Sequence, residues 1–215
     1  MQKYGYHAIL HTAAATFICM RHVPNVLTIT RILLTPVLLV LLMADTLIGQ
    51  AWAFVLFVIA AISDYLDGKI ARSYKVRSRL GQFLDPFADK VLVLGTFAAL
   101  AYLVPSVIPW WTVVLIALRD LMVTYLRTRA EARGKSIRTL GIARAKTLVQ
   151  LIFLIAILLL LVLAKMPGEL GRLASLLLES PVPFMLLLGV VVFTLITGAA
   201  YLFQKEYSSP AQPNG

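Results

Sequence analysis

The chain has 215 residues, of which 60% are hydrophobic, and a formal net charge of +10. So apolar a composition excludes an ordinary soluble domain, and the length suffices for several membrane-spanning helices. The positive charge does not predict nucleic-acid binding, because Lys and Arg of membrane proteins gather in the loops that face the cytoplasm.

The sequence contains six apolar stretches whose lengths are typical of membrane-spanning helices. They cover residues 27–44, 51–67, 82–104, 108–126, 148–164 and 182–203, and the fifth can be extended back to about Ala143. The sequence therefore predicts an all-α integral membrane protein, with residues 23–205 forming a six-transmembrane-helix bundle.

The two ends of the chain differ from this bundle. Residues 1–22 are apolar between Ala8 and Met20, with few flanking positive charges and no clear cleavage site. They predict a short N-terminal interfacial helix in preference to a signal peptide, and the sequence does not decide between Met1 and Met20 as the start of translation. Residues 206–215, with their Ser, Pro, Gln and Asn, predict a disordered tail.

Basic residues are unevenly shared among the connections between the predicted spans. The turns at 45–50 and 104–109 contain no Lys or Arg, whereas the second and fourth connections are crowded with them: Lys69, Arg72, Lys75, Arg77 and Arg79, then Arg127, Arg129, Arg133, Lys135, Arg138, Arg144 and Lys146. By the positive-inside rule, these two connections and both termini face the cytoplasm of a multi-pass protein in the cell (inner) membrane. The loop at 165–181 has balanced charges, as expected on the outer side.

Four of the ten acidic residues lie close together within this apolar sequence, at Asp64, Asp67, Asp85 and Asp89. An isolated carboxylate inside a membrane helix costs roughly 3 kcal/mol or more. On helices, the spacings i, i+3 and i, i+4 place each pair on one face, so two facing helices bring four carboxylates together. Oxygen ligands suit Mg²⁺ or Mn²⁺, and the absence of Cys and His from this segment disfavours zinc.

The spacing of these aspartates resembles the diagnostic motif of the CDP-alcohol phosphotransferase family. Every fixed position of the motif is present, in the order Asp64, Asp67, Gly68, Ala71, Arg72, Gly81, Asp85 and Asp89. The resemblance extends over about residues 24–205. It implies a membrane enzyme that transfers a phosphate-linked lipid from a CDP-lipid to an alcohol with release of CMP, uses two divalent ions, and forms a homodimer.

The resemblance also implies roles for single residues. Asp64, Asp67, Asp85 and Asp89 are the expected metal ligands, and Asp89 is in addition the expected general base for the acceptor alcohol; the sequence alone does not separate a base from a ligand. The expected nucleotide-binding residues are Asn25, Thr28, Gly68, Ala71, Arg72 and Gly81. Helix packing for the glycines and helix-start roles for Asn25 and Thr28 are the alternative interpretations.

The acceptor has to be sought outside the motif. Arg119 lies beside Asp120 in an apolar span, where it either forms an internal ion pair or reaches the active site. The segments around Arg119 and around Arg144 and Lys146 resemble those of phosphatidylglycerophosphate synthases, although Asp120 replaces the usual Glu and Arg144 is offset. Arg119, Arg144 and Lys146 are therefore the expected binding residues for an acceptor phosphate, and glycerol 3-phosphate is the expected acceptor beside CDP-diacylglycerol.

Two alternatives remain open at this point. One is an enzyme of the same family that uses inositol phosphate, serine or phosphatidylglycerol as acceptor. The other is a divalent-cation transporter whose metal pathway is lined by the four aspartates. The outer turns, which contain no Lys or Arg, and the apolar run Val91–Leu94 disfavour such a pathway.

Overall fold

A computed structural model describes residues 30, 32–74, 79–132, 135–136, 141–202 and 207–208. Within these ranges, the side chains of residues 64–74, 79–89, 127, 130–132, 135–136, 141–144, 200–202 and 207–208 are not described. The predicted interfacial helix at 1–22 therefore lies outside the described residues, as does most of the predicted tail. The chain divides into two compact units, residues 1–95 and 96–215.

The described part of the first unit contains three helical segments. They are the helix Ile32–Met43, the helix α2 (Leu47–Tyr74), and the part of α3 (Arg79–Leu103) up to Gly95. Gly95 packs on the first of these helices, since a Cβ there would lie 3.5 Å from Leu39 and 3.6 Å from Thr35. Buried apolar side chains fill the unit: Leu38, Leu42, Ala53, Phe57, Ala60 and Ala61.

A tight turn joins the helix Ile32–Met43 to α2. Asp45 adopts a left-handed conformation with φ 50°, and its side chain accepts a hydrogen bond from Gln50 at 2.9 Å. The Thr46 hydroxyl accepts from the backbone N–H of Gly49 at 3.1 Å and so caps the first turn of α2. Gly49 itself is required by space, because a Cβ would lie 2.7 Å from the Leu41 carbonyl oxygen. These contacts start α2 four residues before the predicted span at 51.

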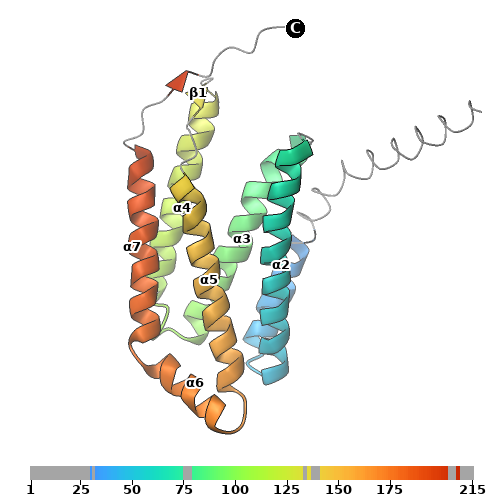
Figure 1. The fold of residues 1–215 in the computed structure, drawn as a ribbon, viewed down its shortest axis with the longest axis vertical. Coiled ribbons are helices and arrows are strands. Elements are labelled where there is room, and N and C mark those ends of the chain that lie inside the picture. Colours follow the sequence, from blue (N-terminus) through green and yellow to red (C-terminus); the bar gives the residue numbers. More distant parts are fainter. Residues whose placement is uncertain are drawn as a thin grey trace, which may run out of the picture. The chain divides into compact units, whose positions relative to one another are not determined.

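The second unit continues from the end of α3 through α4 (Trp110–Ala132), α5 (Gly141–Ala164), α6 (Glu169–Glu179) and α7 (Val182–Leu202). α7 packs against α4, α5 and α6, and α5 also packs against α6 (Figure 1). Phe97 and Phe153 stack in its core with ring centroids 6.1 Å apart. Around them lie buried Leu100, Ile108, Ile116, Leu154, Ile157 and Leu158.

A pair of two-residue strands, β1 (Lys135–Ser136) and β2 (Tyr207–Ser208), accompanies these helices. The strands pair antiparallel, with Lys135 opposite Ser208 and Ser136 opposite Tyr207. β2 falls within the segment that the sequence predicts to be a disordered tail, so backbone pairing orders at least these two residues. Apart from this pair, the regular structure of the described chain is helical, close to the predicted all-α class.

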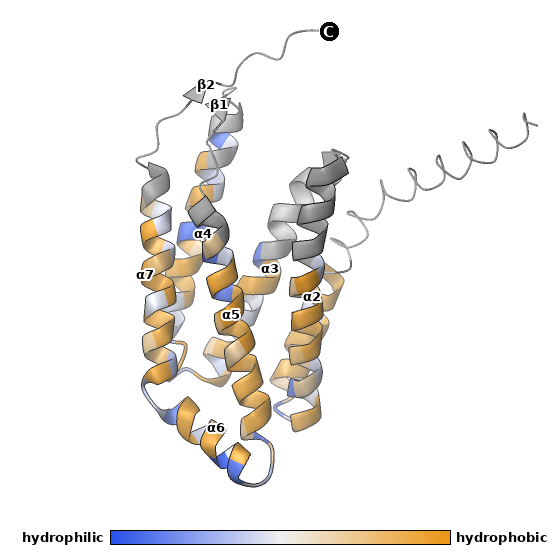
Figure 2. Ribbon diagram, viewed as in Figure 1, coloured by the Kyte–Doolittle hydropathy of each residue, from blue (hydrophilic) through white to orange (hydrophobic). Residues whose placement is uncertain are grey.

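Two described helical segments are long and apolar enough to cross a membrane, Ala145–Ala164 and Val182–Ala199. Figure 2 shows α5 and α7 as largely hydrophobic along their described lengths. Three shorter apolar helices, Ile32–Met43, Leu47–Ser63 and Lys90–Leu103, coincide with three further predicted spans. α4 occupies the remaining one, and its apolar run is broken by Arg119 and Asp120. The architecture is consistent with a membrane protein.

Candidate active site

The aspartate motif lies on two consecutive helices of the first unit. Asp64 and Asp67 belong to α2, and Asp85 and Asp89 belong to α3. The predicted helical spacings i, i+3 and i, i+4 are therefore present in the backbone. The side chains of these aspartates, like those of Gly68, Ala71, Arg72 and Gly81 at the same helix ends, lie outside the described part of the structure.

The helix bounds place the two aspartate pairs at similar distances from the ends of α2 and α3 that the connection joins. Asp67 stands seven residues before the end of α2 at Tyr74, and Asp85 stands six residues after the start of α3 at Arg79. At 1.5 Å per residue, these positions are about 10 Å and about 9 Å from the helix ends. The four-residue connection between the ends favours antiparallel neighbours, for which the two pairs would fall at the same level.

The four carboxylates form a donor set that suits a hard divalent ion. Mg²⁺ and Mn²⁺ take oxygen ligands, and a site with several carboxylates also offsets the charge of the ions. Among the side chains that the structure describes, no three His, Cys, Asp or Glu come together as metal ligands. The aspartate motif thus remains the candidate metal site, and the described chain provides no competitor to it.

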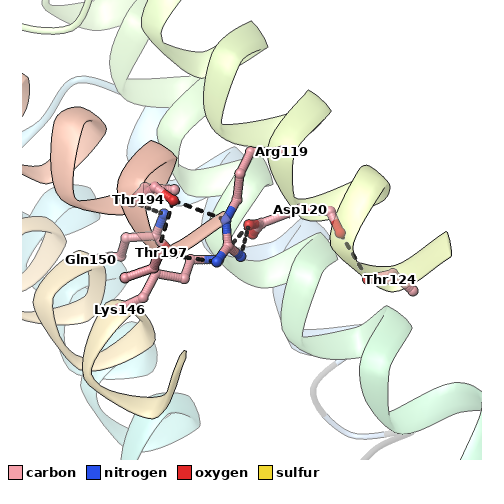
Figure 3. A network of polar contacts seen from close by, with 7 residues as sticks. All are labelled: Arg119, Asp120, Thr124, Lys146, Gln150, Thr194 and Thr197. Atoms are coloured by element: carbon pink, nitrogen blue, oxygen red, sulfur yellow. Dashed lines mark hydrogen bonds and ion pairs between the residues drawn. The ribbon is translucent and has the colours of Figure 1, made fainter. Parts of the chain in front are cut away.

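A second polar site, built from three helices of the second unit, is described at side-chain level (Figure 3). Arg119 and Asp120 come from α4, Lys146 and Gln150 from α5, and Thr194 and Thr197 from α7. Asp120 Oδ1 accepts from Arg119 Nη1 at 3.1 Å and also forms an ion pair with Lys146 Nζ. The residues predicted to bind an acceptor phosphate, Arg119 and Lys146, therefore meet on one carboxylate.

The other N–H donors of Arg119 form hydrogen bonds to helix α7. Arg119 Nε donates to the Thr194 carbonyl oxygen at 3.0 Å, and Nη2 donates to Thr197 Oγ1 at 3.1 Å. The Thr197 hydroxyl in turn donates to the Thr194 carbonyl at 2.8 Å, and Gln150 Nε2 donates to Thr194 Oγ1 at 3.3 Å. The guanidinium plane is thus fixed from two sides, by Asp120 and by α7.

All the side chains of this network are buried. Arg119, Asp120 and Lys146 are only 7–8% exposed, and Gln150, Thr194 and Thr197 are almost fully buried. Charges removed from the surrounding medium are tolerated only when they are paired and hydrogen-bonded, which is the arrangement found here. The internal ion pair considered for Arg119 and Asp120 is therefore present, and Lys146 belongs to it as well.

The contributions of α7 and of Gln150 were missed by the sequence reasoning. Gln150 lies one turn after Lys146 on the same helix side, and Thr194 and Thr197 lie three residues apart in the otherwise apolar α7. Polar residues at helical spacing in an apolar span were the available signal. The other predicted residues are not tested: the side chain of Arg144, on the first turn of α5, is not described, and Asn25 and Thr28 lie outside the described residues.

Comparison with known proteins shows the family to which the chain belongs. The model of the CDP-alcohol phosphatidyltransferase family matches residues 21–200. The chain therefore belongs to the CDP-alcohol phosphatidyltransferase family, as the aspartate motif indicates.

Three individual proteins are similar to this chain over different shares of its length. A Bacillus subtilis protein named CDP-diacylglycerol–glycerol-3-phosphate 3-phosphatidyltransferase is 30% identical over 88% of this chain and 97% of its own length. A Rickettsia typhi protein of the same name is 35% identical over 66% of this chain and 78% of its own length. A Streptomyces coelicolor protein named cardiolipin synthase (CMP-forming) is 33% identical over 46% of this chain and 47% of its own length.

Proposed function

We propose that the protein is a CDP-diacylglycerol–glycerol-3-phosphate 3-phosphatidyltransferase of phospholipid biosynthesis. It transfers the phosphatidyl group from CDP-diacylglycerol to glycerol 3-phosphate and releases CMP. The observation that carries the proposal is the match to the Bacillus subtilis relative of that name, which extends over 97% of that protein. The complete aspartate motif on α2 and α3 supplies the chemical support.

The proposed reaction is a displacement at phosphorus. A hydroxyl oxygen of glycerol 3-phosphate forms a bond to the β-phosphorus of CDP-diacylglycerol, and the bond from this phosphorus to the oxygen shared with the α-phosphate breaks. CMP leaves with that oxygen. Asp89 is the proposed general base, whose carboxylate takes the proton of the attacking hydroxyl. An alcohol is a weak nucleophile near neutral pH, so this proton acceptor matters for the rate.

The remaining motif residues bind the donor. Asp64, Asp67, Asp85 and Asp89 would hold two Mg²⁺ or Mn²⁺ ions, which when bound neutralise the pyrophosphate and stabilise the leaving oxygen. Arg72 offers a planar guanidinium to a donor phosphate. The proposed nucleotide pocket is completed by the small residues of the motif, Gly68, Ala71 and Gly81, and by two polar residues that precede it, Asn25 and Thr28.

Arg119, Arg144 and Lys146 are proposed to bind the phosphate of the acceptor. Arg119 and Lys146 support this role because they bring two positive charges to one buried carboxylate, Asp120, so an anion that approaches them is attracted in a poorly screened environment. The same contacts give Asp120 the task of holding both cations in place before the acceptor arrives.

The membrane arrangement is part of the proposal. The chain crosses the cell membrane six times, with the aspartate motif and both termini on the cytoplasmic side, where water-soluble glycerol 3-phosphate is available. The distribution of Lys and Arg between connections supports this orientation. We also propose a homodimer, on the strength of the family resemblance.

A second candidate is the same chemistry with another acceptor. The Streptomyces coelicolor relative has a different name, cardiolipin synthase (CMP-forming), so phosphatidylglycerol, inositol phosphate and serine are the other acceptors to test. Transport of divalent cations is the remaining alternative from a different class.

Release of CMP by the purified protein tests these functions together. The protein in detergent receives CDP-diacylglycerol and Mg²⁺, with glycerol 3-phosphate, inositol phosphate, serine or phosphatidylglycerol added one at a time. We expect CMP and a new phospholipid with glycerol 3-phosphate only. Selectivity for another acceptor would retain the family and replace the acceptor. Inactivity with all four by folded, metal-binding protein would call for tests of other alcohols first and of transport after them.

A further inference from the structure

The short helix α6 joins α5 to α7 and has a surface with no role in the proposed reaction. α6 packs on both neighbours, and Figure 1 shows it running across the ends of α5 and α7 where the two helices are connected. The sequence predicted only a loop with balanced charges here. α6 is therefore an additional helix at the edge of the two most apolar spans.

Three sides of α6 differ in chemistry. Gly171 and Ala174 form the side buried against the rest of the unit. A second side carries leucines at positions i, i+3 and i+7 that remain largely exposed, Leu170 (54%), Leu173 (59%) and Leu177 (41%), and the equally exposed Leu176 (55%) lies at its border with the charged residues. The charged residues Arg172 and Glu179 lie on a third side, because at about 100° of rotation per residue Arg172 is about 100° from Leu173 and Glu179 is about 160° from Leu177. Figure 2 shows hydrophilic and hydrophobic residues interleaved along α6.

The backbone at its start fixes which side of α6 is exposed. Gly168 has φ 92°, a conformation that side chains disfavour, and it begins the helix. A Cβ at Gly171 would come within 1.9 Å of the Met166 carbonyl oxygen, so this turn of α6 lies directly on the preceding backbone. The helix has no freedom to roll its leucines inward while these contacts exist.

The exposed leucines continue the apolar surface of α7. Val182, Met185 and Leu186 are exposed at the start of α7, and Met166 is exposed at the end of α5. Both neighbours contain segments long and apolar enough to cross a membrane. If α7 crosses the membrane as proposed, its exposed residues contact acyl chains, and the leucines of α6, which packs on α7, lie on the adjoining helix. The charged flank, including the exposed ion pair of Arg172 and Glu169 at 3.6 Å, would remain in water.

We propose that α6 is an in-plane membrane-surface helix whose Leu170, Leu173 and Leu177 lie among lipid acyl chains at the boundary of the hydrocarbon layer. An amphipathic helix with leucines on one side and charges on the other binds bilayers in this orientation. Because α6 connects α5 to α7, an α6 at the membrane surface also fixes how deep these two helices lie in the bilayer. This inference depends on the membrane-spanning architecture and not on the acceptor.

Fluorescent labels at matched positions test the proposal in the full-length protein. The single cysteine, Cys19, is first replaced by serine. Leu173→Cys then places a polarity-sensitive dye on the leucine side, and Arg172→Cys places the same dye one residue away on the charged flank. Leu177→Cys and Glu179→Cys form a second pair, in case one variant of the first pair does not fold. All are reconstituted in phosphatidylglycerol and phosphatidylethanolamine vesicles.

We expect a blue-shifted emission for the dyes at 173 and 177, with strong quenching by lipid-attached nitroxides and weak quenching by iodide. The dyes at 172 and 179 should show the reverse. Equal access of iodide to both members of a pair would overturn the proposal. Protection of position 173 from both quenchers, together with cross-linking between two copies through this cysteine, would overturn it in favour of a protein–protein contact.

Discussion

Gly198 provides the space that the side chain of Arg119 occupies. A Cβ at position 198 would lie 2.8 Å from Arg119 Cγ and 2.9 Å from Nε, both shorter than an ordinary contact. In the same turn of α7, Thr194 and Thr197 accept hydrogen bonds from the guanidinium. α7 therefore determines where the charge of Arg119 lies, although Arg119 belongs to α4.

Gly198→Ala should accordingly displace the guanidinium without altering the charge of the site. If Arg119 binds the acceptor phosphate, we expect the KM for glycerol 3-phosphate to rise about tenfold, equivalent to about 1.4 kcal/mol, with little change in the KM for CDP-diacylglycerol. Steady-state kinetics of CMP release measures both constants. Gly189→Ala on the same helix is the control, because nothing lies within 4 Å of its Cβ position. Equal constants for the two variants would contradict the assignment.

Asp120→Asn should lower stability. Asp120 bonds both Arg119 and Lys146, and all three side chains are 8% exposed, so loss of the carboxylate leaves two like charges in a buried site. We expect a loss of about 3 kcal/mol in the free energy of unfolding, measured by denaturant titration in detergent. Glu169→Gln serves for comparison, because its ion pair with Arg172 is 70–78% exposed and its loss should leave stability almost unchanged. Similar effects of the two substitutions would refute a stabilising role for the buried carboxylate.

Lys146→Ala tests the acceptor site through charge. If Lys146 binds the phosphate of glycerol 3-phosphate, the acceptor KM should increase about tenfold or more, while the donor KM changes little. Lys146→Arg keeps the positive charge and should recover much of the acceptor affinity. Parallel increases in both KM values, with no recovery by Arg, would instead indicate that Lys146 acts only by pairing with Asp120 in the fold.

Asp89→Asn tests the proposed base. Removal of a general base typically lowers kcat by about 10²- to 10⁴-fold, and we expect a loss in that range while CDP-diacylglycerol still binds. Single-turnover CMP release gives the rate, and isothermal titration with Mg²⁺ reports metal binding. Asp64→Asn provides the contrast, since it should reduce Mg²⁺ affinity directly. If Asp89→Asn lost as much Mg²⁺ affinity as Asp64→Asn, the fall in kcat would follow from lost metal and would not support the role of Asp89 as base.

The sequence predicted several helix positions closely. The predicted spans 82–104 and 182–203 compare with α3 at Arg79–Leu103 and α7 at Val182–Leu202. These elements are visible in the sequence because a long apolar run and its ends are local properties of the chain. α6 was missed, since an 11-residue helix with alternating charged and apolar residues resembles a loop until its packing against α5 and α7 is known.

The amino-acid sequence by itself determined the chemistry of this protein: the aspartates, their spacing on two helices, and with them the family. Only the tertiary structure decided which residues the side chains of Arg119 and Lys146 contact, because these partners are distant in the chain. Arg119 meets Thr194 and Thr197 across 75 and 78 residues, and Lys146 meets Asp120 across 26. Helical periodicity specifies which residues share a face of one helix, but the contacts between helices depend on how those faces pack.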